Sequence, residues 1–212
     1  MQNSQLLVII STVVIFVLSL LLAISLTRKY NKTKAKSLMF WSVGLWAFSI
    51  GALLEIIFAF GVYSSSLGDF YVFIVALLVE LLALGSMELI KSSKLKKLYY
   101  IFAAVTTIAL VYTVIATRIG NIVTNYVASG NPPLAVLYSS SVITFMASII
   151  LVFIAVLSYK RKKDPRMLSI ILGVIIVVIA GTLYIASFPV FLYYSEFVGI
   201  ICLWFGFSSS KK

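Results

Sequence analysis

The chain has 212 residues, of which 62% are hydrophobic and only 11% charged, and its formal net charge is +11. Soluble domains contain about 45–50% apolar and about 25% charged residues, so this composition excludes an ordinary soluble domain and requires lipid around many side chains. The absence of histidine and the single cysteine, Cys202, exclude histidine-based catalysis, an intramolecular disulfide and a cysteine metal site. We therefore expect no cofactor and no enzymatic activity.

The segment before the first apolar stretch carries no positive side chain, whereas Arg28 and Lys29 follow that stretch directly. A cleavable signal peptide has the reverse order of charge. We expect a first helix that is retained in the membrane with its N-terminus outside.

Seven apolar stretches are each long enough to cross a bilayer as a helix, which takes about 20 residues. In chain order they are residues 6–27, 38–62, 70–90, 99–117, 134–159, 167–187 and 190–207. The alternation of polar and apolar residues that marks a membrane β-barrel is absent. The sequence predicts an all-α, polytopic membrane protein in which residues 1–212 form one seven-helix transmembrane domain.

Sixteen of the seventeen Lys and Arg residues fall in every second gap between these stretches. The four basic segments are residues 28–36, 91–97, 160–166 and 211–212. Basic loops are retained on the cytoplasmic side, so the pattern predicts a multi-pass protein of the cell membrane with the N-terminus outside and the C-terminus in the cytoplasm. Orientation accounts for the positive charge without a nucleic-acid partner, and attraction to anionic lipid headgroups is expected as well.

The outer connections are then residues 1–5, 63–69, 118–133 and 188–189. The third is the longest and is rich in Gly, Asn and Pro, which favour loops. The last is so short that spans six and seven must form an antiparallel hairpin. Small residues (Ala47, Gly51) and hydroxyl stripes (Thr106 and Thr113, then Ser140, Thr144 and Ser148) fit helix packing in lipid. The alternative is that the hydroxyl stripes line a wet path.

Three carboxylates lie inside predicted spans, namely Glu55, Glu80 and Glu196. A mid-bilayer charge costs roughly 2.5–3.5 kcal/mol on the insertion scale, and no Lys or Arg lies at a comparable depth. The helical rise places Glu55 and Glu196 roughly 10 Å and 9 Å below the outer face, and Glu80 roughly 15 Å below it. The other acids have simpler explanations, since Asp69 and Asp164 fall in loops and Glu88 lies close to Lys91 at an inner end.

If spans two, three and seven adjoin, these acids frame one polar pocket that opens outward. Its expected lining is Glu55, Glu80, Glu196, Tyr63, Tyr71 and Tyr194. One hypothesis is a cation or proton site. The other is that three protonated carboxyls form hydrogen bonds between neighbouring helices.

The second and third spans also carry a recurring pattern in residues 40–55, 61–63 and 82–86. Trp41 and small residues precede Glu55, a Gly-aromatic turn follows, and the third span ends in a Leu-Gly segment. This hairpin resembles one in a group of uncharacterised seven-helix prokaryotic integral membrane proteins. The resemblance implies the span count and carries no activity, ligand or site residue.

Two classes of function fit this sequence. The first is a non-catalytic sensory or accessory component that presents its basic loops to a cytoplasmic or membrane protein partner. The second is a small proton- or cation-coupled carrier or channel whose path includes the buried glutamates. Neither the oligomeric state nor the ligand follows from the residues. A retinal pigment is excluded, because no predicted span carries a mid-membrane lysine.

Overall fold

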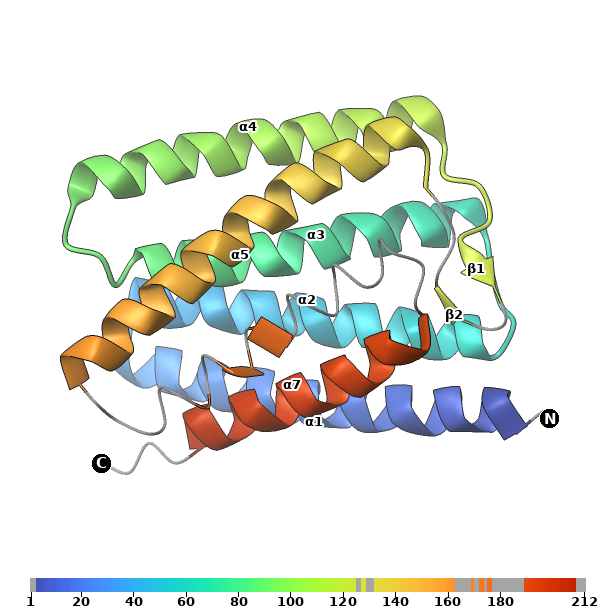
Figure 1. Ribbon diagram of the computed structural model, residues 1–212, viewed down its shortest axis with the longest axis horizontal. Helices are drawn as coiled ribbons and strands as arrows, with labels where there is room; N and C mark the ends of the chain where they lie inside the picture. Colours follow the sequence, from blue (N-terminus) through green and yellow to red (C-terminus); the bar gives the residue numbers. More distant parts are fainter. Residues whose placement is uncertain are drawn as a thin grey trace.

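Figure 1 shows the computed structural model, which describes residues 3–124, 127–128, 132–162, 169, 172–173, 175–176 and 189–208. Within these residues the chain forms six helices and one short β-hairpin: α1 Asn3–Thr33, α2 Lys36–Ala59, α3 Ser65–Met87, α4 Ser93–Thr117, β1 Val123–Thr124, β2 Val127–Ala128, α5 Leu134–Lys162 and α7 Pro189–Ser208. Helices α1 to α5 are each long and apolar enough to cross a membrane. The all-helical architecture with several helices of membrane-spanning length is therefore confirmed.

The predicted sixth span, residues 167–187, lies almost wholly outside the described residues. The five residues described within it are helical: Ser169, Leu172, Gly173, Ile175 and Ile176. The Ser169 hydroxyl donates to the carbonyl of Cys202 at 2.6 Å, and a Cβ on Gly173 would lie 2.9 Å from the carbonyl oxygen of Gly199. Ser169 thus contacts Cys202, and the later residue Gly173 contacts the earlier residue Gly199. This order is that of two antiparallel helices. The count of seven spans stays a prediction.

The helix ends differ from the apolar stretches in a systematic way. At the basic end, α1 continues to Thr33 and α4 begins at Ser93, so much of the sequence predicted as basic loop is helical. Lysine and arginine are good helix formers and can extend from a helix end into the polar interface. At the other end α2 stops at Ala59, and Gly61 adopts φ +82° in the turn that follows.

Helix α3 begins earlier than predicted, because the Ser64 side chain caps it by accepting from the backbone N–H of Leu67 at 3.2 Å. Asp69 therefore lies inside α3, and its predicted loop position was wrong. Its carboxylate accepts from the backbone N–H of Ile119 at 3.0 Å, which ties α3 to the segment after α4.

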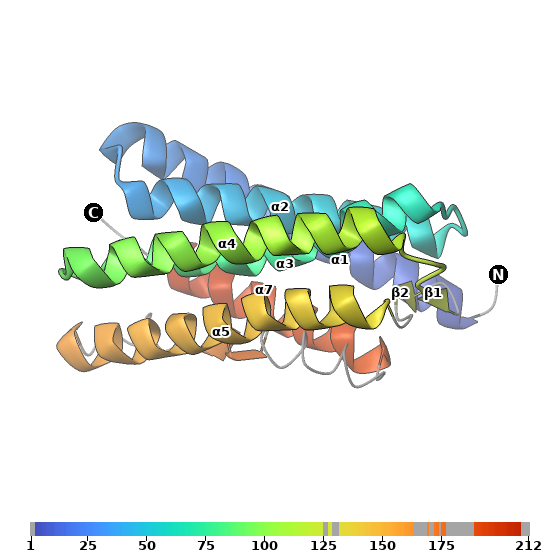
Figure 2. The same ribbon diagram turned by 90° about the horizontal axis from the view of Figure 1, so that it is seen from above.

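Helices α1, α2 and α3 lie side by side, α4 and α5 pack on α3, and α7 packs on α1 (Figures 1 and 2). Helices α2 and α3 form the core, since 67% of the apolar window of each is buried against 22% in α4 and α5. The outer face of α4 is correspondingly open, with Ile108, Tyr112 and Ile115 each 68–72% exposed. In a membrane that face contacts lipid.

The closest approach in the core is between α2 and α3. A Cβ on Gly44 would lie 3.1 Å from Leu82, and one on Gly85 would collide with the ring of Trp41 and lie 2.9 Å from the carbonyl of Ser37. Gly51, by contrast, has room for a Cβ, because its nearest neighbour would be Ile74 at 3.7 Å. Small residues thus allow close packing here, as is usual between helices in lipid.

The hydroxyl stripes are satisfied within or between helices. Ser140, Thr144 and Ser148 each donate to carbonyls of their own helix, one turn earlier. Thr113 on α4 lies 2.9 Å from Ser139 on α5. These contacts favour the packing hypothesis over a wet path.

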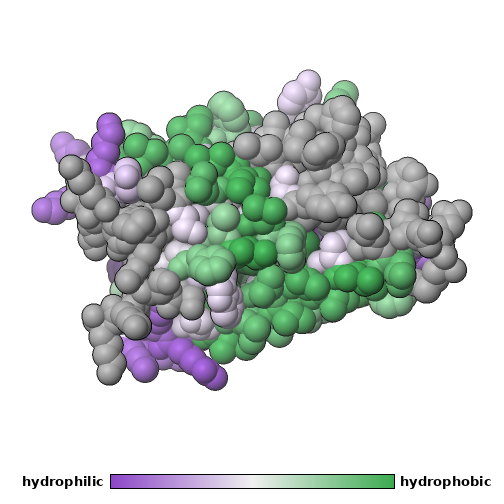
Figure 3. Space-filling view, turned by 60° about the horizontal axis from the view of Figure 1, so that its bottom comes forward, coloured by the Kyte–Doolittle hydropathy of each residue, from purple (hydrophilic) through white to green (hydrophobic). Residues whose placement is uncertain are grey.

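All described basic segments gather at one end of the bundle. In Figure 1 helices α1, α3, α5 and α7 begin at the right and end at the left, whereas α2 and α4 begin at the left. The described basic segments 28–36, 91–97 and 160–162 therefore share the left end, whereas Arg118, which follows α4, lies at the other end. Figure 3 shows hydrophilic side chains collecting there, beside a hydrophobic band over the middle of the molecule.

The long connection after α4 holds the β-hairpin, which the sequence analysis predicted as loop. Val123 pairs with Ala128 and Thr124 with Val127 in antiparallel register. Ile119, Ile122 and Ala128 are at most 1% exposed, so this connection covers the outer end of the core. Strands of two residues are too short to produce a recognisable period-two pattern.

Candidate functional site: buried carboxyl groups

Glu55 is buried near the C-terminal end of α2 with one defined partner. It is 3% exposed, and the Tyr71 hydroxyl of α3 donates to its Oε1 at 2.6 Å. Tyr71 is equally buried and is held by an edge-on contact with Phe58, with ring centroids 5.5 Å apart. Tyr71 therefore holds Oε1 of Glu55 in place, and Oε2 takes no part in this hydrogen bond.

Glu196 of α7 is the second buried carboxyl group at this end of the bundle, and it lies within electrostatic range of Glu55. The Oε2 atoms of Glu55 and Glu196 are both fully buried, and neither has a hydrogen-bond partner among the described residues. Two carboxylates in a low-dielectric interior cannot both ionise without a large cost. A proton on either carboxyl group would remove that cost.

Glu80 belongs to a different cluster. It is 1% exposed, the Thr107 hydroxyl of α4 donates to its Oε2, and the Thr106 hydroxyl lies 3.2 Å from its Oε1. Tyr99, also on α4, is close enough to interact electrostatically with Glu80, and its hydroxyl is buried without a partner among the described residues. Glu80 therefore ties α3 to α4 instead of joining Glu55.

The observed helix bounds also correct the predicted depths. Glu80 lies roughly 22 Å along α3 from Ser65, not 15 Å, because the helix begins earlier. Glu55 and Glu196 lie roughly 6 Å and 10 Å from the ends of α2 and α7 that face away from the basic end. Glu80 lies towards the basic end.

Tyr63 lies in the turn between α2 and α3, where its ring contacts Phe58 and its hydroxyl donates to the carbonyl of Gly120 at 2.5 Å. Burial raises the pKa of Tyr63 above its ordinary 10.0, and the nearby Asp69 charge acts in the same direction. The hydroxyl therefore stays protonated and holds the segment after α4 in place. Tyr194 lies in α7, and its side chain is outside the described residues. Of the six predicted residues, Glu55 and Tyr71 are joined by a hydrogen bond, and Glu196 lies within electrostatic range of Glu55.

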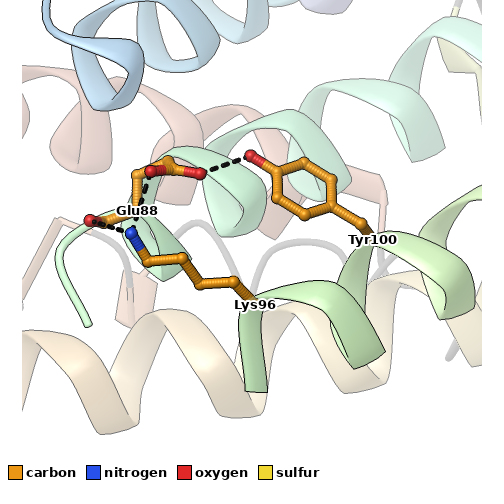
Figure 4. A network of polar contacts seen from close by, with 3 residues as sticks. All are labelled: Glu88, Lys96 and Tyr100. Carbon is orange, nitrogen blue, oxygen red and sulfur yellow. Dashed lines mark hydrogen bonds and ion pairs between the residues drawn. The ribbon is translucent and has the colours of Figure 1, made fainter. Parts of the chain in front are cut away.

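At the basic end, Glu88 links α3 to α4 (Figure 4). The Tyr100 hydroxyl donates to its Oε1 at 2.6 Å, and the Lys96 ammonium lies 3.0 Å from both its Oε2 and its backbone carbonyl. Glu88 thus forms its ion pair with Lys96 of α4, because α3 ends at Met87 and the chain turns back to bring the first turns of α4 against Glu88. The hydrogen bond from Tyr100, followed by the contacts of Lys96, holds the pKa of Glu88 below 4.5.

We expect Glu88→Gln to lower the free energy of unfolding by about 1–3 kcal/mol at neutral pH, the range for hydrogen bonds to charged groups. Because the folded-state pKa lies below the unfolded value, this stability is fully present above about pH 4.5. It is lost as the pH falls through the folded-state pKa. Thermal unfolding in detergent across this range would measure it, with Lys97→Gln as an exposed control from the same end. Two results would contradict this role of Glu88. One is an equal loss of unfolding free energy in Glu88→Gln and Lys97→Gln, and the other is a loss of stability at acid pH that is the same in Glu88→Gln as in the original protein.

The threonines that hold Glu80 were only partly anticipated. Thr106 appeared in the predicted hydroxyl stripe, but Thr107 did not, although two adjacent threonines in an apolar helix are a signal for an interhelical polar contact.

Comparison with known protein families, with characterised proteins and with solved structures finds no match to this chain.

Proposed function

We propose that this chain is a seven-helix integral membrane protein of the cell membrane, with its N-terminus outside and its C-terminus in the cytoplasm. Five described helices of membrane length support the insertion. The clustering of the basic segments at one end supports the orientation, because cationic ends are retained in the cytoplasm. The antiparallel contacts of Ser169 and Gly173 with α7 support the sixth and seventh spans.

Within this architecture we propose a non-catalytic sensory or accessory component that acts through a cytoplasmic or membrane protein partner. The Glu55–Glu196 pair is its proton-responsive element. The observation that carries this proposal is the two buried Oε2 atoms that lack hydrogen-bond partners in the described part of the chain. When both carboxyls are charged they repel, and when one holds a proton the repulsion is removed.

Among the described side chains, few other groups can influence the pair. Tyr71 is the titratable side chain that α3 presents to Glu55. Helix α1 packs on both α2 and α7, and it carries no titratable side chain between Gln5 and Thr27. Because α7 is anchored mainly on α1, repulsion at its outer half can tilt it away from α2. That tilt would carry a signal to the basic end, where α7 finishes.

The test is a distance measurement between spin labels at Phe60→Cys and Val198→Cys, both exposed, in a Cys202→Ser background. We expect the distance to grow by about 1–2 Å, the scale of helix shifts in switching proteins, as the pH rises from about 5 to about 9. Glu196→Gln should abolish the change, since an amide cannot ionise. Glu80→Gln is the matched control and should retain it. If the distance between the two labels does not change with pH in the protein that keeps both Glu55 and Glu196, the proposal is refuted.

The second candidate is a proton- or cation-coupled carrier, and the same unpartnered oxygens favour it because they can release and rebind a cation. Glu80, which was expected on the path, is enclosed and bonded to α4. Flux of protons or Na⁺ into reconstituted vesicles separates the two candidates. Flux that is lost in both Glu55→Gln and Glu196→Gln, but kept in Glu80→Gln, would establish the carrier.

A further inference from the structure

A groove of about 440 Å³ lies between the second half of α1 and the last turns of α7. One face of α1 and a tryptophan of α7 line it, including Leu21, Ile24, Ser25, Arg28, Lys32 and Trp204. The α1 residues recur at every turn, at positions 21, 24–25, 28 and 32, so they follow one another along a single side of the helix. The groove is separate from the carboxyl pair, which lies at the opposite end of the bundle.

The groove changes character along its length. Leu21, which is 47% exposed, and Ile24 make its inner part apolar, and Ser25 follows. Arg28 and Lys32 make its end basic, and both side chains are exposed. From Leu21 to Lys32 the helix rises roughly 16 Å. This order, apolar then polar then cationic, matches a phospholipid whose acyl chain points into the bilayer and whose phosphate lies at the interface.

The charge of the groove has no counter-charge from its own lining. Among the described residues that border it, none is acidic. Of the described acids, Glu88 is paired with Lys96 between α3 and α4, and Asp69 lies at the other end on Ile119. An anion is therefore the occupant that the electrostatics favour. Trp204 contributes an aromatic wall at the depth where tryptophan rings contact lipid headgroups.

We propose that this groove binds one anionic phospholipid from the leaflet that faces the basic end. Arg28 and Lys32 hold its phosphate, Trp204 lies against the headgroup and glycerol region, and Leu21 and Ile24 contact an acyl chain. A free phosphate ion would leave the apolar half of the groove open. Figure 3 is consistent with this arrangement, since the hydrophobic surface gives way to hydrophilic groups at the end of the bundle where α1 finishes.

The experiment uses the full chain in detergent with Trp41→Phe and Trp46→Phe, so that Trp204 is the remaining tryptophan. Phosphatidylglycerol with brominated acyl chains should quench Trp204 with saturation, and brominated phosphatidylcholine should quench it far less. We expect the double substitution Arg28→Gln and Lys32→Gln to weaken the affinity for phosphatidylglycerol about thirtyfold. Each cation near a membrane surface contributes about 1 kcal/mol of attraction to anionic lipid, and the double substitution removes two. Ser25→Phe keeps every charge and fills the groove, and it should also abolish saturable quenching.

The matched control is Lys94→Gln with Lys97→Gln, which removes two exposed cations from the same end but outside the groove. It should change the affinity less than threefold, a range set by long-range charge alone. Equal weakening in the control pair would show that the attraction is a general surface effect and would overturn the site. Equal quenching by phosphatidylcholine, or displacement of the lipid by millimolar inorganic phosphate, would overturn it too. A Ser25→Phe variant that folds and binds normally would also be decisive against it.

Discussion

Replacing Gly85 with alanine is expected to destabilise the folded protein by about 1–3 kcal/mol, and replacing it with valine by more. The added Cβ would lie 2.8 Å from Nε1 of Trp41 and 2.9 Å from the carbonyl oxygen of Ser37. The second contact is with backbone, so no rotamer change can relieve it, and α2 must move away from α3. The contact lies in the most buried part of the bundle, where a small shift disturbs many neighbours. Thermal unfolding in detergent measures the loss.

Gly51→Ala is the matched control, since both glycines are helical and both face the α2–α3 contact. Its new Cβ would meet Ile74 at 3.7 Å, an ordinary contact. Alanine also favours the helix over glycine by about 0.5–1 kcal/mol, so this variant should be neutral or slightly more stable. If Gly85→Ala proves no less stable than Gly51→Ala, the close approach of the two helices is wrong.

Replacing Glu80 with alanine is the second large effect, with an expected loss of about 2–4 kcal/mol. The substitution empties a site that is 1% exposed. It also leaves the Thr107 hydroxyl without the carboxylate to which it donates, because no other acceptor of that hydroxyl occurs among the described residues. Thr106 suffers less, since it also donates to the carbonyl of Phe102 at 2.9 Å. The measurement is again the unfolding free energy in detergent.

Glu80→Gln keeps the volume and one acceptor oxygen, and it should cost no more than about 1 kcal/mol. A double-mutant cycle of Glu80→Ala with Thr107→Val should give a coupling of about 0.5–3 kcal/mol, as expected for residues in contact. Additive effects would mean that the α3–α4 tie does not exist. A Glu80→Gln variant as unstable as Glu80→Ala would mean that the charge, not the hydrogen bonds, holds Glu80 in place.

The helices themselves follow from the sequence because lipid forces apolar stretches of this length into helices. Their ends do not. The caps that set them, such as Ser64 at α3, are short-range polar contacts that a hydropathy pattern ignores. At the basic end, Lys and Arg extend the helices past the apolar stretches. The early start of α3 accounts for the misplacement of Asp69 and for the depth error at Glu80.

The sequence placed three acids inside helices, but it set neither the depth of Glu80 nor the partners of the three carboxyl groups. Which helix faces which is a tertiary property, so the bonding of Glu80 to α4 and of Tyr63 to Gly120 could not be read from spacing. The tight contact at Gly85 was missed for the same reason, since a glycine reveals close packing only when its neighbour is known.

The central claim is that the bundle crosses a bilayer with its basic end in the cytoplasm, and cysteine accessibility tests it most directly. In a Cys202→Ser background, single substitutions Ser66→Cys, Lys94→Cys, Lys160→Cys and Ser208→Cys sample both ends of the described helices. A membrane-impermeant maleimide should label Ser66→Cys in intact cells and the other three only after the cells are opened. Labelling of Ser66→Cys and Lys94→Cys from the same side, or of Lys160→Cys and Ser208→Cys from opposite sides, would contradict it.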